Sequence, residues 1–214
     1  MSVNDPYDEL MRHLGEAKER FTADVRDAEM TVLKDEGIYR HLTFSFPKAS
    51  WSWCEVVTWP HMLVLRGDLG CWSFSRVEDM FDFFREPEDV TRMDPSYWAE
   101  KLVPGGRDSA KEYSGERAAA YVVQTMEENA AEHPDLSKDA QDVFFTDADL
   151  STETGLREAV ARFDERFPAY AIAKGFRFPV EQWDLHRYSP WFLLACVVLP
   201  WTIEQYDTAR VPVA

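Results

Sequence analysis

The sequence predicts an α+β fold, in which an N-terminal helix precedes an antiparallel β-meander of four or five short strands packed against several C-terminal helices. Three observations predict this class. Apolar residues recur at three- and four-residue steps near the N-terminus, which is typical of an amphipathic helix. Apolar and polar residues alternate between residues 30 and 76, which is typical of half-buried strands joined by tight turns. Helical spacing then returns from residue 77 onward.

The size and composition of the chain favour one domain. The chain has 214 residues, of which 45% are hydrophobic and 14% aromatic, and such a chain can bury a substantial core. We expect a single α+β domain over residues 1–214, with a sheet-rich part at 30–76 and a helical part at 77–210. The break at Pro104-Gly105-Gly106 is not taken as a boundary, because the apolar C-terminal helix needs a surface on which to pack.

The first helix is predicted over residues 5–29, with Asp5 as its cap and Pro6 in its first turn. A hairpin follows, in which strands 30–33 and 38–46 flank a tight turn at Gly37. In the second of these strands, Arg40 shares one face with the apolar residues, and His41 lies on the other face.

The sheet continues with a strand over 51–59, in which Trp51, Trp53, Val57 and Trp59 are expected on one side. Strands 62–66 and 71–75 follow. One alternative places Cys54 and Cys71 opposite each other across adjacent strands, and a buried free thiol is the default for each.

A capping box of Ser75 and Glu78 then predicts an aromatic helix that covers the sheet and ends at Pro87.

The remaining elements are predicted to be helical. Their predicted ranges are a short helix at 95–102, a long helix at 109–132, a loop with one short helix at 134–149, a helix at 151–167 capped by Ser151 or Thr152, an irregular segment at 176–179, and a last helix that begins at Ser189-Pro190. The apolar run at 191–201 is too short to span a bilayer, which needs about 20 apolar residues. We therefore expect no membrane association.

The charge of the chain limits its partners. The formal net charge is −16 and the isoelectric point is about 4.7, which disfavours direct nucleic-acid binding because that affinity rests on Lys and Arg contacts to phosphates. Acidic residues concentrate at 78–100 and 127–165. These stretches either mimic a phosphate backbone for a basic protein partner or form an ordinary solvated surface.

Motifs for cofactor or metal chemistry are absent from the sequence. The three cysteines are odd in number and widely spaced, which indicates free thiols in a reducing compartment and argues against a zinc site. Asp147 and Asp149 lack the further ligands of a calcium loop. The chain has no P-loop, GxGxxG or GxSxG motif. We expect no metal and no cofactor, and the sequence favours a protein that is not an enzyme. No signal peptide is visible, because the N-terminus is polar and acidic.

One group of polar and aromatic residues is nevertheless a candidate binding site. The candidate ligand-binding residues are Arg40, His41, Trp59, Arg66, Asp68 and Arg76. In this hypothesis Asp68 orients His41, Arg66 or Arg76 binds an anion, and Trp59 and Trp72 line the pocket.

Two other interpretations remain open. In the structural alternative to this site, Arg40 and Asp68 form an ion pair and Asp68 caps its own turn. His186 is a weaker candidate, which would complete a site with His41.

The block from residue 30 to residue 84 resembles a family of small proteins encoded by tailed phages and bacterial prophages. The resemblance is carried by Val32-Leu33, Asp35-Glu36-Gly37, Tyr39-Arg40-His41-Leu42, Thr58-Trp59-Pro60, Gly67-Asp68 with Gly70, Phe74-Ser75-Arg76 and Asp79-Met80-Phe81. Residues 95–102 and Gln205-Tyr206-Asp207 are also similar. His61 departs from the pattern, which more often has glycine there. The resemblance implies a phage-encoded protein that acts in the cytoplasm of the bacterial host, and it transfers no catalytic residue.

Three functions are compatible with these observations. The first is a non-enzymatic, acidic accessory protein that binds a basic host protein, such as a defence or nucleic-acid-binding protein. The second is a small-molecule or nucleotide-binding protein, sequestering protein or enzyme, with its site around His41, Arg40, Arg66 and Asp68. The third is a structural role in the virion.

Overall fold

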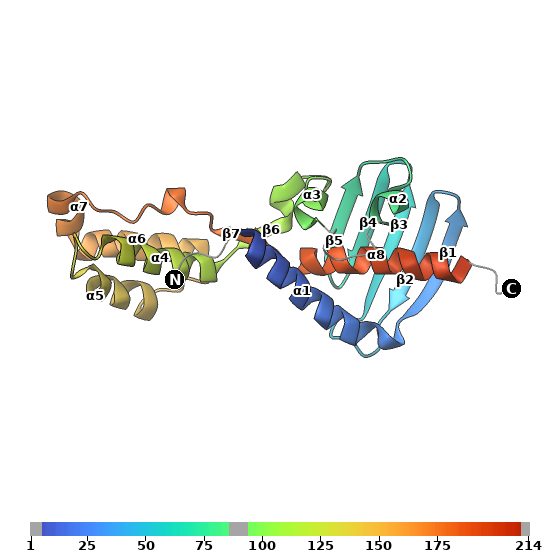
Figure 1. Cartoon of the computed structure of the whole chain (residues 1–214), viewed down its shortest axis with the longest axis horizontal. Coiled ribbons are helices and arrows are strands. Elements are labelled where there is room, and N and C mark those ends of the chain that lie inside the picture. Colours follow the sequence, from blue (N-terminus) through green and yellow to red (C-terminus); the bar gives the residue numbers. More distant parts are fainter. Residues whose placement is uncertain (1–5, 86–93, 211–214) are drawn as a thin grey trace. The chain divides into compact units, whose positions relative to one another are not determined.

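The computed structural model describes residues 6–85 and 94–210 (Figure 1). Contacts divide the chain into two compact units. The sheet unit contains Tyr7–Lys111 and the chain from Tyr188 onward, and the helical unit contains Glu112–Arg187. The chain passes between them at β6 (Lys111–Tyr113) and β7 (His186–Tyr188), which pair with each other.

The predicted antiparallel meander is confirmed. Its strands are β1 (Glu29–Glu36), β2 (Tyr39–Ser45), β3 (Trp53–Trp59), β4 (Met62–Gly67) and β5 (Gly70–Ser75). Each strand pairs with the next, so the order in the sheet follows the order in the chain. Gly37 has φ 64°, the left-handed conformation that the predicted hairpin turn requires.

One face of the sheet is buried by helices of the same unit. α1 (Pro6–Asp24) and α8 (Pro190–Arg210) lie across it in Figure 1, and α2 (Met80–Phe84) adds Phe81 and Phe84 to the same core. On β2, Arg40, Leu42 and Phe44 are buried and the residues between them are not. The predicted assignment of faces on this strand is therefore confirmed.

α8 explains why the last part of the chain returns to the sheet. Residues 192–199 of this helix are all buried, and a helix that is apolar all round is stable only when surrounded by other elements. The five strands of the sheet lie within residues 29–75 and most helices follow from residue 80, and the contacts place α8 in the same unit as the sheet. That the two units unfold together as one domain stays a prediction.

The helical unit has its own core. Its elements are α4 (Gly115–Asn129), α5 (Leu136–Gln141), the π-helical turn η4 (Asp142–Thr146), α6 (Glu153–Arg166), α7 (Pro168–Lys174) and the 3₁₀ turn η5 (Val180–Gln182). Ser114 and Thr152 cap α4 and α6, where their hydroxyls accept from backbone amides at 3.3 and 3.0 Å, and the interior is rich in aromatic rings.

Two predicted helix starts are wrong. The expected helix at 109–132 begins only at Gly115, after the 3₁₀ turn η3 (Gly106–Ala110) and β6. The expected capping box of Ser75 and Glu78 does not form, because β5 extends to Ser75 and Asp79 caps α2 instead. Oδ1 of Asp79 accepts from the amide of Phe81 at 3.0 Å.

Three other expectations need correction. Trp51 precedes β3 and is buried, so it does not share the exposed side of that strand. Cys54 and Cys71 cannot pair across adjacent strands, because β4 lies between β3 and β5, and both thiols are free. The short helix α3 spans Pro95–Ala99 and ends earlier than expected. The predicted roles of Asp5 and Pro87 lie outside the described residues.

A buried ion pair connects the sheet to two helices. The side chain of Arg40 is 5% exposed and donates from Nη1 and Nη2 to the two oxygens of Asp79 at 2.9 and 2.8 Å. Its Nε donates to the hydroxyl of Tyr206 on α8 at 3.2 Å, and its guanidinium lies 4.5 Å from the ring centre of Phe81. Arg40 thereby joins β2, the start of α2 and α8.

The same network extends to the edge strand β1. The hydroxyl of Tyr206 donates to Asp35 at 2.6 Å and accepts from Arg210 at 2.6 Å. Burial acts to raise the pKa of Asp79, but the hydrogen bonds from Arg40 and the Phe81 amide outweigh it. The pKa of Asp79 therefore lies below its ordinary value.

Asp79→Asn is expected to lower the free energy of unfolding at pH 7 by about 3–5 kcal/mol, because it leaves a buried guanidinium without its counter-charge. Urea denaturation measures this change. Because the folded pKa of Asp79 is depressed, the stability that the ion pair contributes is fully present above the unfolded pKa of about 3.9 and is lost as the pH falls through the folded pKa.

The control is Asp82→Asn, whose exposed pair with Arg85 contributes about 0–1 kcal/mol. Equal effects of the two substitutions would contradict this account.

The turn between β3 and β4 holds a residue other than glycine in a conformation that favours glycine. His61 has φ 67°, in the left-handed region that favours glycine. We expect His61→Gly to raise the free energy of unfolding by about 0.5–1 kcal/mol and His61→Ala to leave it nearly unchanged, because only glycine relieves the strain. Thermal and urea denaturation of both variants test this, and a less stable His61→Gly protein would refute the assignment of strain.

Candidate functional site: the open face of the sheet

The face of the sheet opposite α1 and α8 is the best candidate for a functional surface, and we call it the open face. The strand register places its side chains in rows across the sheet. One row contains Thr43, Glu55, Arg66 and Cys71, and the next contains His41, Val57, Val64 and Ser73. Trp59 and Met62 pair in a third row, beside Tyr39 at the start of β2.

Glu55 is the polar centre of the open face. Its side chain is only 9% exposed, although it points away from the core. Oε1 accepts from Nε of Arg66 on β4, and Oε2 accepts from Nε2 of His41 on β2 at 2.9 Å. Arg66 lies directly opposite Glu55 and His41 lies on the diagonal, both within reach across an antiparallel sheet. The charges of Glu55 and Arg66 thus cancel within the sheet.

The carboxyl of Glu55 is held in its ionised form. Burial acts to raise the pKa of Glu55, but hydrogen bonds from His41 and Arg66 and the charge of Arg66 outweigh that effect. The pKa of Glu55 therefore lies below its ordinary value. An ionised carboxylate accepts hydrogen bonds and donates none, so Nε2 of His41 is the donor in this pair.

Exposed aromatic rings surround this polar centre. Tyr39 is 47% exposed, Trp53 is 40% exposed and Trp59 is 39% exposed. The guanidinium of Arg66 lies 6.0 Å from the ring centre of Trp53, and the ammonium of Lys34 lies 6.0 Å from that of Tyr39. Trp53 and Trp59 lie at the two ends of β3, with Glu55 and Val57 between them on the same face. Exposed apolar side chains that gather on one face can mark an interaction surface.

Cys71 and His41 do not form a nucleophile–base pair. His41 and Glu55 form a dyad that can hold a proton, but the exposed thiol of Cys71 lies on β5, three strands from His41. At the usual strand spacing this separation is about 14 Å, beyond hydrogen-bond reach.

The structure brings together three of the six predicted site residues. His41, Trp59 and Arg66 lie on the open face. Arg40 lies on the core face, where it pairs with Asp79, and the alternation of side chains along β2 separates it from His41. The predicted pocket that contained both residues is thus wrong.

Asp68 neither orients His41 nor pairs with Arg40. It lies in the turn between β4 and β5, where its carboxylate accepts from the amide of Ser52 at 2.6 Å and its own amide donates to the carbonyl of Trp53 at 3.2 Å. Asp68 therefore fixes the loop that precedes β3. The predicted role of Asp68 in orienting His41 and its predicted ion pair with Arg40 are therefore wrong, because its carboxylate binds the amide of Ser52 instead.

The other candidates lie elsewhere. Arg76 is exposed just after β5 and has no ion-pair partner among the described residues. Trp72 packs on Phe192 of α8, on the core side of the sheet, so it does not line a pocket with Trp59. His186 belongs to the helical unit, where its ring meets the edge of Tyr113.

Sequence reasoning missed Glu55, Trp53 and Tyr39 as members of the site. A signal for Glu55 was present, because it is the only charged residue in β3, between tryptophans at both ends of the strand. A carboxylate in such a strand needs a cross-strand partner. The register that supplies Arg66 and His41 was not readable from the chain.

Within residues 6–85 and 94–210, the structure places no group of three or more His, Cys, Asp or Glu side chains suitably for a metal ion. Every helix in those ranges is too short or too polar to cross a bilayer. Comparison of the chain with models of protein families, with curated proteins and with solved structures found no match.

Arg66→Gln is expected to raise the pKa of Glu55, because the substitution removes the opposing charge while the burial of the carboxyl remains. A pH titration of the ¹³C-labelled Glu55 carboxyl by NMR measures the change. Arg76→Gln removes one arginine charge from the same unit without touching Glu55, and it should leave the titration unchanged. Equal shifts in the two variants would indicate a general charge effect and would refute the specific pair.

Proposed function

We propose that this chain is a non-enzymatic binding protein, encoded by a tailed phage or prophage, that holds a basic protein of the bacterial host against the open face of its sheet. One observation carries the proposal: Tyr39, Trp53 and Trp59 are exposed together on a sheet face whose own central charges pair with each other. Tyrosine and tryptophan are the residues most enriched at the energetic centres of protein interfaces.

The charge of the chain supports a basic partner. A net charge of −16 attracts a cationic protein and speeds its association. The helical unit contributes many exposed acidic residues, among them Glu127, Glu128, Glu132, Asp135, Asp142, Asp147, Asp149, Glu158 and Glu165. Such a surface takes the place of a phosphate backbone in the basic groove of a defence or nucleic-acid-binding protein.

The aromatic rings of the open face support the same partner chemistry. Trp53 and Tyr39 each already have a cation near the ring, from Arg66 and Lys34. Among the described residues no cation lies over Trp59, so its ring is available to an arginine or lysine of the partner.

The phage origin and the cytoplasmic location of this function rest on two observations. The block at residues 30–84 resembles phage and prophage proteins, and the three free cysteines are consistent with a reducing compartment. A nucleotide site is not proposed, because Arg40, Asp68 and His41 lie in three different environments.

Capture from lysates of permissive bacterial hosts, with the tagged full chain as bait, tests the proposal. We expect one stoichiometric basic protein, released at high salt because salt screens the charge attraction. With that protein purified, Trp59→Ala should weaken binding by about 30-fold, as expected for an aromatic side chain at the centre of an interface. Isothermal titration calorimetry measures the Kd.

Ile172→Ala is the matched control, because Ile172 is an apolar residue of the helical unit that is 84% exposed. It should leave the Kd unchanged. The proposal fails if several permissive hosts yield no partner, or if Trp59→Ala binds as tightly as the unmodified chain.

A further inference from the structure

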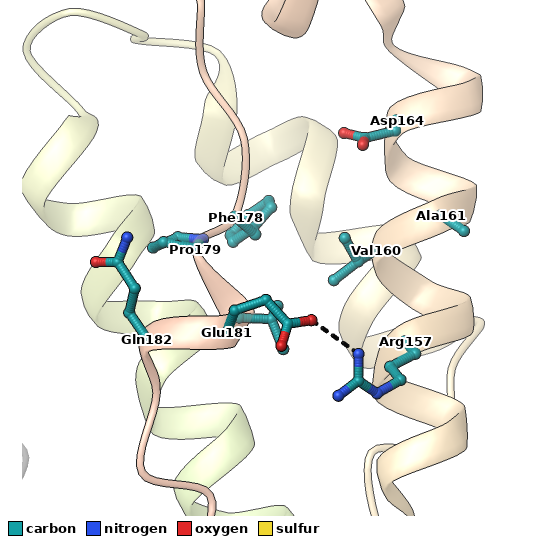
Figure 2. A pocket seen from close by; sticks show the side chains of 9 residues that line it. Arg157, Val160, Ala161, Asp164, Phe178, Pro179, Glu181 and Gln182 are labelled. Carbon is teal, nitrogen blue, oxygen red and sulfur yellow. Dashed lines mark hydrogen bonds and ion pairs between the residues drawn. The ribbon is translucent and has the colours of Figure 1, made fainter.

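The helical unit contains a pocket of about 470 Å³ between α6 and the chain that follows α7 (Figure 2). From α6 it is lined by Arg157, Val160, Ala161 and Asp164, which share one face of the helix because they are three or four positions apart. The opposite wall is residues 178–182. The volume lies in the range of about 300–1,000 Å³ that is usual for small-molecule sites.

The interior of this pocket is apolar and firmly supported. Phe178 is 5% exposed and packs against the rings of Phe144 and Phe163, with centroids 4.7 and 5.2 Å away. Val160 and Val180 are partly buried against the same cluster. Figure 2 shows Phe178 and Val160 pointing into the space between the two walls.

The positive charge at the rim is already bound. Arg157 donates from Nε and Nη2 to Glu153 at 3.2 and 3.0 Å, and from Nη1 to Glu181 at 2.9 Å. The last of these bonds connects the two walls of the pocket in Figure 2. One guanidinium thus lies between two carboxylates, which leaves it poorly placed to receive an anionic ligand.

Acceptors at the rim are free, by contrast. Asp164 accepts from Arg177 at 2.9 Å through Oδ2 only, and Glu181 accepts from Arg157 through Oε1 only. Among the described residues, no group donates to Oδ1 of Asp164 or to Oε2 of Glu181. The rim therefore offers free carboxylate oxygens above an apolar interior.

We propose that this pocket binds a small free amine with an apolar body. The body lies on Val160, Phe178 and Val180, and the ammonium group donates to the carboxylate of Asp164 at the rim. An ammonium group has three donors and no acceptor, which matches the free oxygens of the rim. The site lies wholly within the helical unit and does not depend on the partner proposed for the open face.

The test uses the ¹⁵N-labelled full chain and three probes of similar size, 2-phenylethylamine, 2-phenylethanol and 3-phenylpropanoate, in ¹H–¹⁵N NMR titrations at pH 7. We expect the amine to give saturable shifts at amides of α6 and of residues 178–182, with a Kd of about 0.1–10 mM for so small a ligand. The alcohol should bind about fivefold more weakly, and the carboxylate should not bind.

Asp164→Asn should reduce the affinity for the amine about fivefold, to that for the alcohol, because it removes the partner of the ammonium group. Glu165→Gln makes the same charge change at an exposed neighbour outside the pocket and should leave the affinity unchanged. The proposal is overturned if the carboxylate binds as tightly as the amine, if the two variants behave alike, or if no probe gives saturable shifts.

Discussion

The buried ion pair of Arg40 and Asp79 connects the sheet to the helices that cover one of its faces. A guanidinium inside the core is stable only with a counter-charge and satisfied donors, and Asp79 and Tyr206 supply both. This requirement fixes which face of β2 points toward α2 and α8. Because side chains alternate along a strand, turning Arg40 inward turns Tyr39 and His41 outward. The inward placement of Arg40, together with that of Leu42 and Phe44, thus sets which side chains β2 contributes to the open face.

The open face combines a paired polar centre with exposed aromatic side chains. Its central charges, Glu55 and Arg66, neutralise each other and hold their side chains in place across the strands. Its aromatic side chains remain exposed around them. A rigid, locally neutral platform within a strongly acidic protein can use long-range attraction to bring a basic partner close and aromatic contacts to hold it.

Much of the fold was predictable from the sequence, and less of the site. The alternation in β2 placed Arg40 with the core residues, and Gly37 marked the hairpin turn, because both are local signals. The predicted start of α2 was wrong, because both Ser75 and Asp79 can cap a helix. Asp79 is the cap in the structure, where it also pairs with Arg40, 39 residues away in the chain. Asp68 was misjudged for the same reason, since its partner, Ser52, lies in another loop. The place of α8 and the neighbours of Glu55 likewise depend on contacts between distant segments.

We propose that the partner binds the open face and no other aromatic surface of the chain. Hydroxyl-radical footprinting of the chain alone and in its complex tests this directly, because it reports the solvent access of single aromatic side chains. We expect the partner to reduce oxidation of Tyr39, Trp53 and Trp59. Trp191, which is 43% exposed on α8, should be oxidised as in the free chain. Protection of Trp191, with the open face unchanged, would contradict it.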